Sequence, residues 1–316
     1  MTYKSLTVMT PVFNEVKNVD YFLEKMVPQL HSLSSIHELE VKLTIIDNCS
    51  TDETVELLLR KLSAIPGINF EIISWVRNYG VMTSIYGGII ESNTDALVVI
   101  DFDLQDPPEL IGSLVERWLS GDSFVYGSRA KRLENLSIKA LRKIFYLLAG
   151  ALRVNSSVPV ESGLWLLDRN VVNDLIANPP ATRYLAGAVG LRDYKSSYIT
   201  YSRNKRLHGE SKFSTKRYFG YAFEALFSNP HRIARISIGF SFFTIVFGGI
   251  LETFLLICRY FFEIQIPNGL ISSILIQVLS FSGIFLALGV IGEYVANIYT
   301  SVCRPAKAIA KLRIKS

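Results

Sequence analysis

Short apolar runs separated by amphipathic segments fill the first part of the chain. The runs are rich in β-branched residues, as is typical of buried strands, and lie at Leu6–Thr10, Val41–Ile46, Phe70–Trp75 and Leu97–Ile100. The segments 53–62 and 81–92, which follow two of these runs, have the pattern of helices. This alternation of strands and helices predicts an α/β fold with a mainly parallel, doubly wound sheet.

Each predicted strand is followed by a cluster of polar residues. The clusters are Thr10–Glu15, Asp47–Asp52, Arg77–Gly80 and Asp101–Asp106. Ligands bind at the carboxyl ends of the strands in such sheets, so we expect the four clusters to form one site. The sequence contains no G-x-G-x-x-G or G-x-x-x-x-G-K-[ST] motif, so a dinucleotide-dependent redox enzyme or a P-loop protein would lack its phosphate-binding loop.

The cluster after the fourth strand carries the most specific chemistry. Asp101 and Asp103 lie on the same side of an extended chain, and Gln105 follows two residues later. Pro107 and Pro108 then stop the strand and suit the first turn of a helix. Two close carboxylates repel each other unless a cation lies between them, and a hard divalent cation that also holds a diphosphate is the natural occupant. The alternative is a pair of solvated loop acids.

The pattern changes at Ile236, where two long apolar segments begin. The segments 236–262 and 270–296 are each long enough to cross ~30 Å of hydrocarbon as a helix, and a buried core hairpin is the alternative. Lys and Arg residues flank the pair on both outer sides, whereas the loop 263–269 has none. The first residues lead directly into a strand-like run without a signal peptide. We therefore expect both termini and the catalytic part on the cytosolic side.

These patterns divide the chain into two predicted domains. Residues 1–235 form a cytosolic catalytic domain, with basic amphipathic helices near 139–152 and 212–228 that lie on the membrane surface or pack on the core. Residues 236–316 form a membrane domain that ends in a basic cytosolic tail. The net charge of +5 comes largely from the flanks of the spans, which suits membrane lipids or an anionic lipid substrate and not nucleic acid. Glycine and serine in the spans would permit close helix packing, including in a homo-oligomer.

The motifs resemble a known enzyme family. The segments Thr10-Pro11-Val12-Phe13-Asn14-Glu15, Asp47-Asn48-Cys49-Ser50-Thr51-Asp52 and Asp101-Phe102-Asp103-Leu104-Gln105-Asp106-Pro107-Pro108 are similar to those of family 2 glycosyltransferases with a GT-A fold. The tail, with Gly289-Val290-Ile291-Gly292-Glu293-Tyr294, Tyr299 and Arg304-Pro305, resembles the polyisoprenyl-phosphate glycosyltransferases. These include bactoprenol glucosyltransferases and relatives of dolichol-phosphate mannose synthase. The resemblance covers nearly the whole chain.

The resemblance implies an inverting transfer of a single sugar. The donor would be a nucleotide-diphosphate sugar, with UDP-glucose favoured, and the acceptor would be undecaprenyl phosphate or another polyprenyl phosphate at the cytosolic membrane face. The product would serve as a lipid-linked sugar donor for later glycosylation. The Gln-X-X-Arg-Trp motif of processive polysaccharide synthases is absent, which argues against chain elongation.

The resemblance also implies roles for residues on the donor side. Pro11, Asn14 and Glu15 would line the nucleotide pocket. Asp47 would meet the uracil or ribose, and Asn78 would lie near the diphosphate. The metal ligands would be Asp101, Asp103 and Gln105, which would hold Mg²⁺ or Mn²⁺ against the diphosphate and so stabilise the departing nucleotide.

On the acceptor side, the resemblance places Arg129 at the end of a strand, facing the acceptor phosphate, for which a guanidinium fork is well suited. Lys139 and Arg142 would add basic contacts. Arg206, Ser211 and Lys212 belong to an Arg-x-x-Gly-x-Ser-Lys motif that would close over the site or meet the phosphate. The alternative for this last motif is a basic surface loop.

The sequence departs from the family at one position. Relatives usually carry Thr-Gly-Asp or Ser-Gly-Asp followed by an aromatic residue and Arg, and that Asp is often proposed as the base. Here the segment is Glu161-Ser162-Gly163-Leu164-Trp165, which leaves Glu161 as the candidate base. A phosphate monoester with a second pKa of ~6 is already largely anionic at neutral pH and needs no base. Two alternatives remain: a membrane-anchored pseudoenzyme or scaffold, and transfer to another lipid acceptor, such as a glycolipid hydroxyl.

Overall fold

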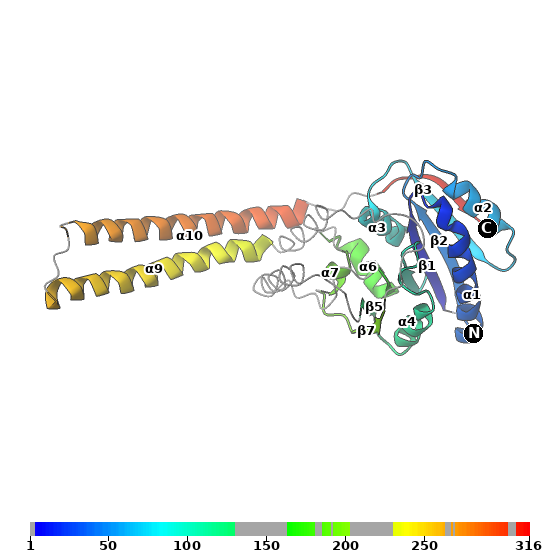
Figure 1. The fold of residues 1–316 in the computed structure, drawn as a ribbon, viewed down its shortest axis with the longest axis horizontal. Coiled ribbons are helices and arrows are strands. Elements are labelled where there is room, and N and C mark those ends of the chain that lie inside the picture. Colours follow the sequence, from blue (N-terminus) through cyan, green and yellow to red (C-terminus); the bar gives the residue numbers. More distant parts are fainter. Residues whose placement is uncertain are drawn as a thin grey trace. The chain divides into compact units, whose positions relative to one another are not determined.

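Eight strands form one sheet in the order β7-β5-β6-β4-β1-β2-β3-β8 (Figure 1). This computed structural model describes residues 4–129, 163–180, 185–190, 192–202, 230–262, 267, 269–302 and 308–316. The strands are β1 (Ser5–Val12), β2 (Glu40–Asp47), β3 (Asn69–Trp75), β4 (Ala96–Val99), β5 (Phe124–Arg129), β6 (Trp165–Asp168), β7 (Ser196–Tyr201) and β8 (Ala310–Lys315).

The centre of the sheet is parallel, as predicted. Strand β1 pairs in parallel with both β2 and β4, and β2 pairs in parallel with β3. The parallel pair β5–β7 joins this centre through β6, which runs antiparallel to both β4 and β5. The four predicted strands are confirmed, with ends that differ by one or two residues from the apolar runs.

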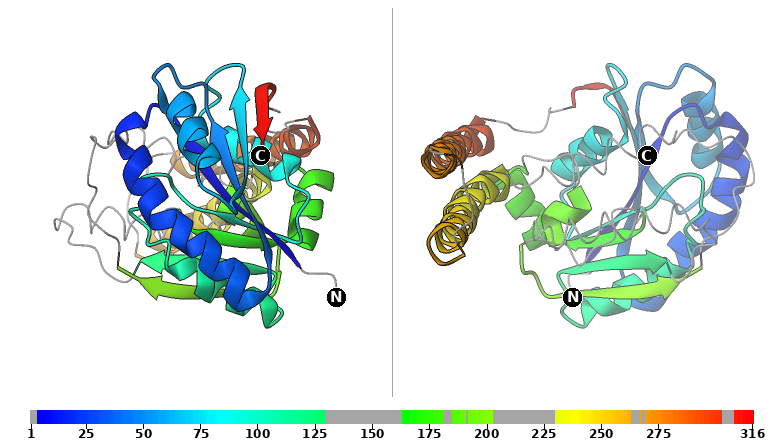
Figure 2. Two further views of the ribbon diagram at one scale, coloured as in Figure 1. Left: turned by 90° about the vertical axis from the view of Figure 1, so that its right-hand side faces the viewer. Right: turned by 60° about the vertical axis from the view of Figure 1, so that its left-hand side comes forward.

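Helices cover both faces of the sheet (Figure 2). In the first compact unit, which contains the sheet, they are η1 (Val16–Asn18), α1 (Val19–His37), α2 (Thr54–Ser63), α3 (Val81–Glu91), α4 (Leu110–Leu119), α6 (Arg169–Ala177) and α7 (Leu185–Gly190). Buried side chains of α1, α2 and α4 belong to one hydrophobic cluster, and those of α3, α6 and α7 belong to another. The two clusters lie on opposite faces because side chains alternate along each strand.

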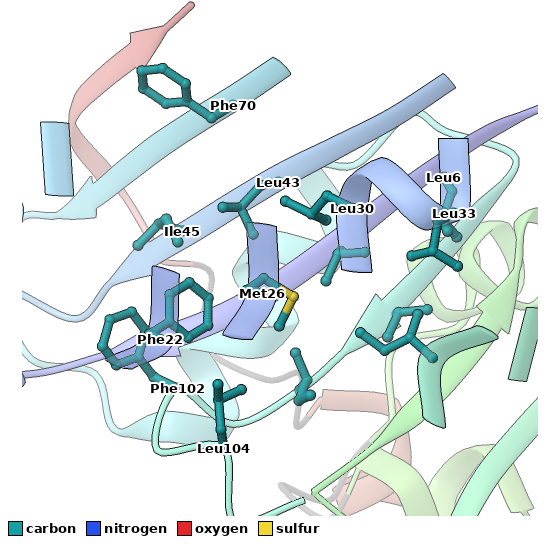
Figure 3. Close-up of a cluster of buried hydrophobic side chains, with 14 of the residues drawn as sticks. Leu6, Phe22, Met26, Leu30, Leu33, Leu43, Ile45, Phe70, Phe102 and Leu104 are labelled. Atoms are coloured by element: carbon teal, nitrogen blue, oxygen red, sulfur yellow. The ribbon is translucent and has the colours of Figure 1, made fainter. Parts of the chain in front are cut away.

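The first cluster holds the loop after β4 in place (Figure 3). Helix α1 presents Phe22, Met26 and Leu30 to the core, where all three are buried. The ring of Phe102 stacks on that of Phe22 with a centroid separation of 4.2 Å, and Leu104 is buried in the same cluster. Full burial of a side chain of this size contributes about 1.5–3 kcal/mol, so the apolar residues of this loop fix the acids between them.

The strand β8 was not predicted from the sequence, which suggested only a basic tail there. It pairs antiparallel with β3 at the edge of the sheet. The buried carboxylate of Glu71 in β3 pairs with Lys42 of β2, with Arg313 Nε at 3.5 Å and with Lys315 Nζ at 3.6 Å. The positive charges of this segment therefore neutralise a buried acid of the catalytic sheet.

The second compact unit contains the helices α9 (Pro230–Phe261) and α10 (Leu270–Val302). The segments Ala234–Phe261 and Leu270–Tyr299 are long and apolar enough to span a membrane, and only 11% of each is buried. A core helix of a soluble protein would be mostly buried, so this exposure favours the predicted spans over a core hairpin. The helices approach closely at Gly248, where a Cβ atom would lie 2.5 Å from Val278 Cγ2.

The amphipathic helices predicted near 139–152 and 212–228 lie outside the described residues. They remain predictions.

Candidate active site

The carboxyl ends of β1 and β2 are joined by the side chain of Asn14. The backbone N–H of Asn14 donates to Ser50 Oγ at 3.0 Å, and its Oδ1 accepts from the backbone N–H of Thr51 at 2.8 Å. Asn14 has a φ of 51°, a left-handed conformation that asparagine tolerates better than most residues. The predicted nucleotide-pocket residue therefore also sets the shape of the loop between them.

Further contacts at the end of β1 involve Glu15 and Pro11. The backbone N–H of Glu15 donates to Thr54 Oγ1 at 2.9 Å, and its Oε2 accepts from Asn18 Nδ2 at 2.6 Å. Pro11 is paired with Ile46 in the β1–β2 register. All three residues predicted to line the nucleotide pocket thus lie on one short stretch at the carboxyl edge of the sheet.

The ends of β2 and β3 are joined by a residue that sequence reasoning did not single out. Asn48 is buried, and its Nδ2 donates to Asn78 Oδ1 at 2.9 Å while its Oδ1 accepts from the backbone N–H of Tyr79 at 2.9 Å. Asp47, also buried, accepts from the backbone N–H of Ser50 at 2.9 Å. The only signal for Asn48 was its place inside the polar cluster after β2.

Buried and partly exposed positions alternate in the loop after β4. Phe102 and Leu104 are 3% and 2% exposed, whereas Asp101, Asp103 and Gln105 are each partly exposed. The backbone N–H of Gln105 donates to Asp103 Oδ1 at 3.2 Å, which orients that carboxylate. The core anchors of this loop thus turn its polar side chains toward the carboxyl edge of the sheet.

These three polar side chains fit a hard divalent cation. Two carboxylates and one amide carbonyl offer only oxygen ligands. Within the described part of the chain, no group of three His, Cys, Asp or Glu side chains could enclose a metal. A partial set of oxygen ligands suits an ion such as Mg²⁺, which is typically held by one or two carboxylates together with substrate phosphates.

Arg129, the last residue of β5, lies beside a buried acid. Its side chain is 14% exposed, and Nη2 is 3.5 Å from each carboxylate oxygen of the fully buried Asp106. Tyr201, the last residue of β7, donates its hydroxyl to Asp106 Oδ1 at 2.6 Å. Burial lowers the pKa of Arg129, but the charge of Asp106 together with Tyr201 and the charge of Asp101 outweighs it, so the net pKa is raised and the guanidinium stays charged. Burial and the neighbouring Asp106 raise the pKa of the Tyr201 hydroxyl, which therefore stays protonated as a donor.

The backbone at Gly163 lies directly against the side chains of Asp101 and Asp106. A Cβ atom at this position would lie 2.5 Å from Asp101 Oδ2 and closer still to Asp106 Oδ2. Only glycine allows the backbone to approach this closely. Sequence reasoning missed Tyr201, included Asp106 only as the end of a polar cluster without a role, and considered Gly163 only as part of an altered motif.

The remaining predicted acceptor-side residues are not placed. Lys139, Arg142, Glu161, Arg206, Ser211 and Lys212 lie outside the described residues. Asp168, the last residue of β6, has a structural role. Its Oδ1 accepts from the backbone N–H of Asn170 at the start of α6, and its Oδ2 accepts from Trp118 Nε1 at 2.8 Å.

The sheet, the strand-end acids and the exposed helix pair define a glycosyltransferase of the GT-A class with two candidate membrane helices. The sequence profile described as "Glycosyl transferase family 2" matches residues 7–176, and the chain belongs to this family. It is similar to the uncharacterized glycosyltransferase YkcC of Bacillus subtilis, with 30% identity over 299 residues, covering 93% of this chain and 89% of that protein.

Two further comparisons concern the whole chain and the fold. A prophage bactoprenol glucosyl transferase homolog of Escherichia coli K12 is 27% identical over 315 residues, covering 98% of this chain and 99% of that protein. Glucosyl-3-phosphoglycerate synthase of Mycobacterium tuberculosis, solved with Mn²⁺, UDP-glucose and glycerol 3-phosphate, superposes with a TM-score of 0.51 at 17% identity. The superposition covers 72% of this chain and 80% of that one. The similarity to the mycobacterial synthase concerns the fold alone. The helices and the bactoprenol transferase relatives together indicate a membrane-associated protein.

Proposed function

We propose that the protein transfers one sugar from a UDP-sugar to undecaprenyl phosphate or another polyprenyl phosphate. The proposal depends on one observation: the same chain carries two apolar helices and the acid pair Asp101 and Asp103, which suits a metal bound to a nucleotide-sugar donor. The bactoprenol glucosyl transferase homolog covers this same combination from end to end. Glucose is the favoured sugar, because the relatives with a named sugar include several glucosyl transferases.

The donor would be held at the ends of β1 to β4. Asp101, Asp103 and Gln105 would hold Mg²⁺ or Mn²⁺, and the bound ion would neutralise negative charge on the diphosphate. The mycobacterial synthase of similar fold was solved with Mn²⁺ and UDP-glucose, which supports this arrangement. Pro11, Asn14 and Glu15 would line the nucleotide pocket, Asp47 would meet the uracil or ribose, and Asn78 would lie near the diphosphate.

The acceptor phosphate would be gripped by Arg129, whose charge is secured by its buried neighbour Asp106. A phosphate oxygen attacks the anomeric carbon from the face opposite the diphosphate, the bond from that carbon to the diphosphate oxygen breaks, and UDP departs. The configuration at this carbon is therefore inverted. The phosphate monoester, with a second pKa of ~6, needs no general base, so Glu161 would have at most an auxiliary role.

The proposed topology puts the catalytic unit and both ends of the helix pair on the cytosolic side. The distribution of Lys and Arg supports this orientation. The pairing of β8 with β3 supports one part of this topology, the return of the chain to the side of the sheet after both helices, because a strand that follows both helices can join the sheet only on that side.

The decisive experiment incubates purified full-length protein in detergent with undecaprenyl phosphate, Mn²⁺ or Mg²⁺ and a panel of UDP-sugars and GDP-mannose. Lipid products are identified by mass spectrometry. We expect one lipid-linked monosaccharide that depends on added metal, and the preferred donor identifies the sugar. If no donor gives a lipid-linked sugar, the proposed function is wrong.

A specific observation favours one competing function, that of a binding or scaffold protein without turnover. Leu164 follows Gly163 where relatives carry an acid, and its side chain is fully buried. A pseudoenzyme would show UDP-dependent thermal stabilisation that Mn²⁺ enhances, with no product. Transfer to a glycolipid hydroxyl would instead give product only with that acceptor and would require a base such as Glu161.

A further inference from the structure

Asp106 is a buried acid to which the proposed chemistry gives no role. It follows Gln105 directly, and its side chain is fully buried. Burying a carboxylate is costly unless a cation and hydrogen-bond donors compensate it. Both compensating groups described above come from far along the chain, since Arg129 and Tyr201 lie 23 and 95 residues away in sequence. The fold thus brings three separate segments together at this one carboxylate.

The sheet register explains how the two partners meet. Arg129 and Tyr201 are the last residues of the parallel strands β5 and β7 and lie opposite each other in the pairing. The Tyr201 hydroxyl, 2.6 Å from Oδ1, fixes the carboxylate. Arg129 Nη2, 3.5 Å from both oxygens, is at the outer limit of hydrogen bonding and is held mainly by charge. The contact between this guanidinium and Asp106 is therefore mainly electrostatic.

A second acid lies close by and competes for the same cation. Asp101 Oδ2 and Asp106 Oδ2 both lie within 2.5 Å of the point where a Gly163 Cβ would be, so the two carboxylates are neighbours. The charge of Asp101 also contributes to the raised pKa of Arg129. If Asp106 lost its charge, Asp101, one of the acids assigned to the metal, would remain as a neighbouring acid that attracts the guanidinium. An arginine drawn there would be lost to the acceptor and would compete with the metal.

We infer that Asp106 and Tyr201 are positioning residues that hold Arg129 toward the acceptor phosphate and away from Asp101. The inference rests on the proposed function, in which Arg129 binds the phosphate of the lipid. It assigns acceptor affinity to two side chains that touch neither substrate, and it leaves the affinity for the UDP-sugar to the residues at the ends of β1 to β4.

The chain offers a matched control at the other end of the same strands. Asp122 is buried before β5, accepts from Ser197 Oγ of β7 at 2.6 Å and pairs with Lys195 Nζ at 3.2 Å. This cluster also combines a buried aspartate with a hydroxyl group and a cationic side chain. It lies at the start of β5 and β7, whereas Arg129 and Tyr201 end these strands. If buried acids that contact these strands matter only for stability, Asp122→Asn and Asp106→Asn will behave alike.

The test measures the KM for undecaprenyl phosphate and the KM for the UDP-sugar separately, using full-length protein in detergent. We expect Asp106→Asn to raise the lipid KM about tenfold, the low end for a charge-assisted contact, and Tyr201→Phe to raise it less. The donor KM should stay within about twofold for both variants, as should both KM values for Asp122→Asn and Ser197→Ala. Thermal melting verifies that each variant is folded. If Asp106→Asn does not fold, the KM values of Tyr201→Phe provide the test.

A double-mutant cycle separates positioning from a general structural effect. If Asp106 acts through Arg129, Asp106→Asn should change the lipid KM by less than about twofold in an Arg129→Ala background. The inference is overturned if the full effect persists in that background, or if Asp106→Asn raises the donor KM as much as the lipid KM. The latter result would place Asp106 in the metal site.

A chemical probe decides the inference even if the wild-type protein forms no product. Phenylglyoxal modifies accessible guanidinium groups, and peptide mass spectrometry reports the rate at Arg129 without turnover. We expect Asp106→Asn and Tyr201→Phe to change this rate several-fold relative to wild type and Asp122→Asn, because the guanidinium loses its anchor. Absence of product in the wild type would refute the proposed function alone, whereas an unchanged labelling rate in both variants would refute the positioning role alone.

Discussion

The proposed donor and acceptor sides of the site are built in different ways. The donor side consists of loops that directly follow the parallel strands β1 to β4, and each loop carries its own polar residues in a short stretch of sequence. The described part of the acceptor side depends on contacts between β5, β7 and the loop after β4. A site assembled from local motifs can be recognised in a sequence, whereas a site assembled from distant residues is visible only in the fold.

The largest expected effect is on the donor side. Asp103→Ala should remove metal-dependent turnover while leaving the fold nearly intact, because the carboxylate is partly exposed and contributes little to the core. Loss of the metal should cost several kcal/mol of transition-state stabilisation, and chelation of metal from the wild type should have the same effect. Turnover and thermal melting are measured side by side. Activity within a few-fold of wild type would refute the metal assignment.

The next effect tests how the donor loop is held. Phe102→Ala removes the ring stacked on Phe22 and should reduce the free energy of unfolding by about 3–5 kcal/mol. Denaturant unfolding of the full-length protein measures this loss. Leu119→Ala, at an exposed position on α4, is a control for the removal of an apolar side chain and should cost far less. Similar losses for the two variants would contradict the role of the core in fixing this loop.

A smaller effect is expected on the acceptor side. Arg129→Ala should reduce the use of polyprenyl phosphate by about ten- to a hundredfold, because a charge-assisted contact is worth about 1.5–3 kcal/mol. Binding of the UDP-sugar should change little. Separate KM measurements for lipid and donor distinguish the two sides, and an equal loss for both substrates would show that they are not independent.

The smallest effect should follow from Glu161→Gln. If the anionic phosphate needs no base, this variant should be mild, and the wild-type rate should level off above the acceptor pKa of ~6. A true general base would lower kcat by about 10²-fold or more on removal. Rates from pH 5 to 8 decide between these outcomes. A severe Glu161→Gln defect beside a nearly silent Arg129→Ala would overturn the proposed mechanism but not the fold.

Sequence reasoning succeeded where the information is local. The apolar run before Asp101 predicted β4 to within a residue at either end. The i, i+2 argument for Asp101 and Asp103 assumed an extended chain, whereas residues 101–104 form a turn, so their shared side stays a prediction. Sequence reasoning failed for Tyr201, which lies in a strand of alternating exposure 95 residues from the acid that it contacts. It failed for β8 as well, because a short basic segment becomes a strand only through pairing with β3 and the buried Glu71.

The position of β8 has a consequence for how the protein is made. The sheet has β7 at one edge and β8 at the other, and both long helices are encoded between them. Strand β3 is translated early, but its partner leaves the ribosome only after both helices have been synthesised. Until then the edge of β3 exposes unpaired backbone groups and Glu71 lacks two of its cations. If the helix pair spans a membrane as proposed, completion of the catalytic sheet waits until both helices are made and the chain has returned to the side of β3, and a chain in which the second helix fails to insert would keep an open, aggregation-prone edge.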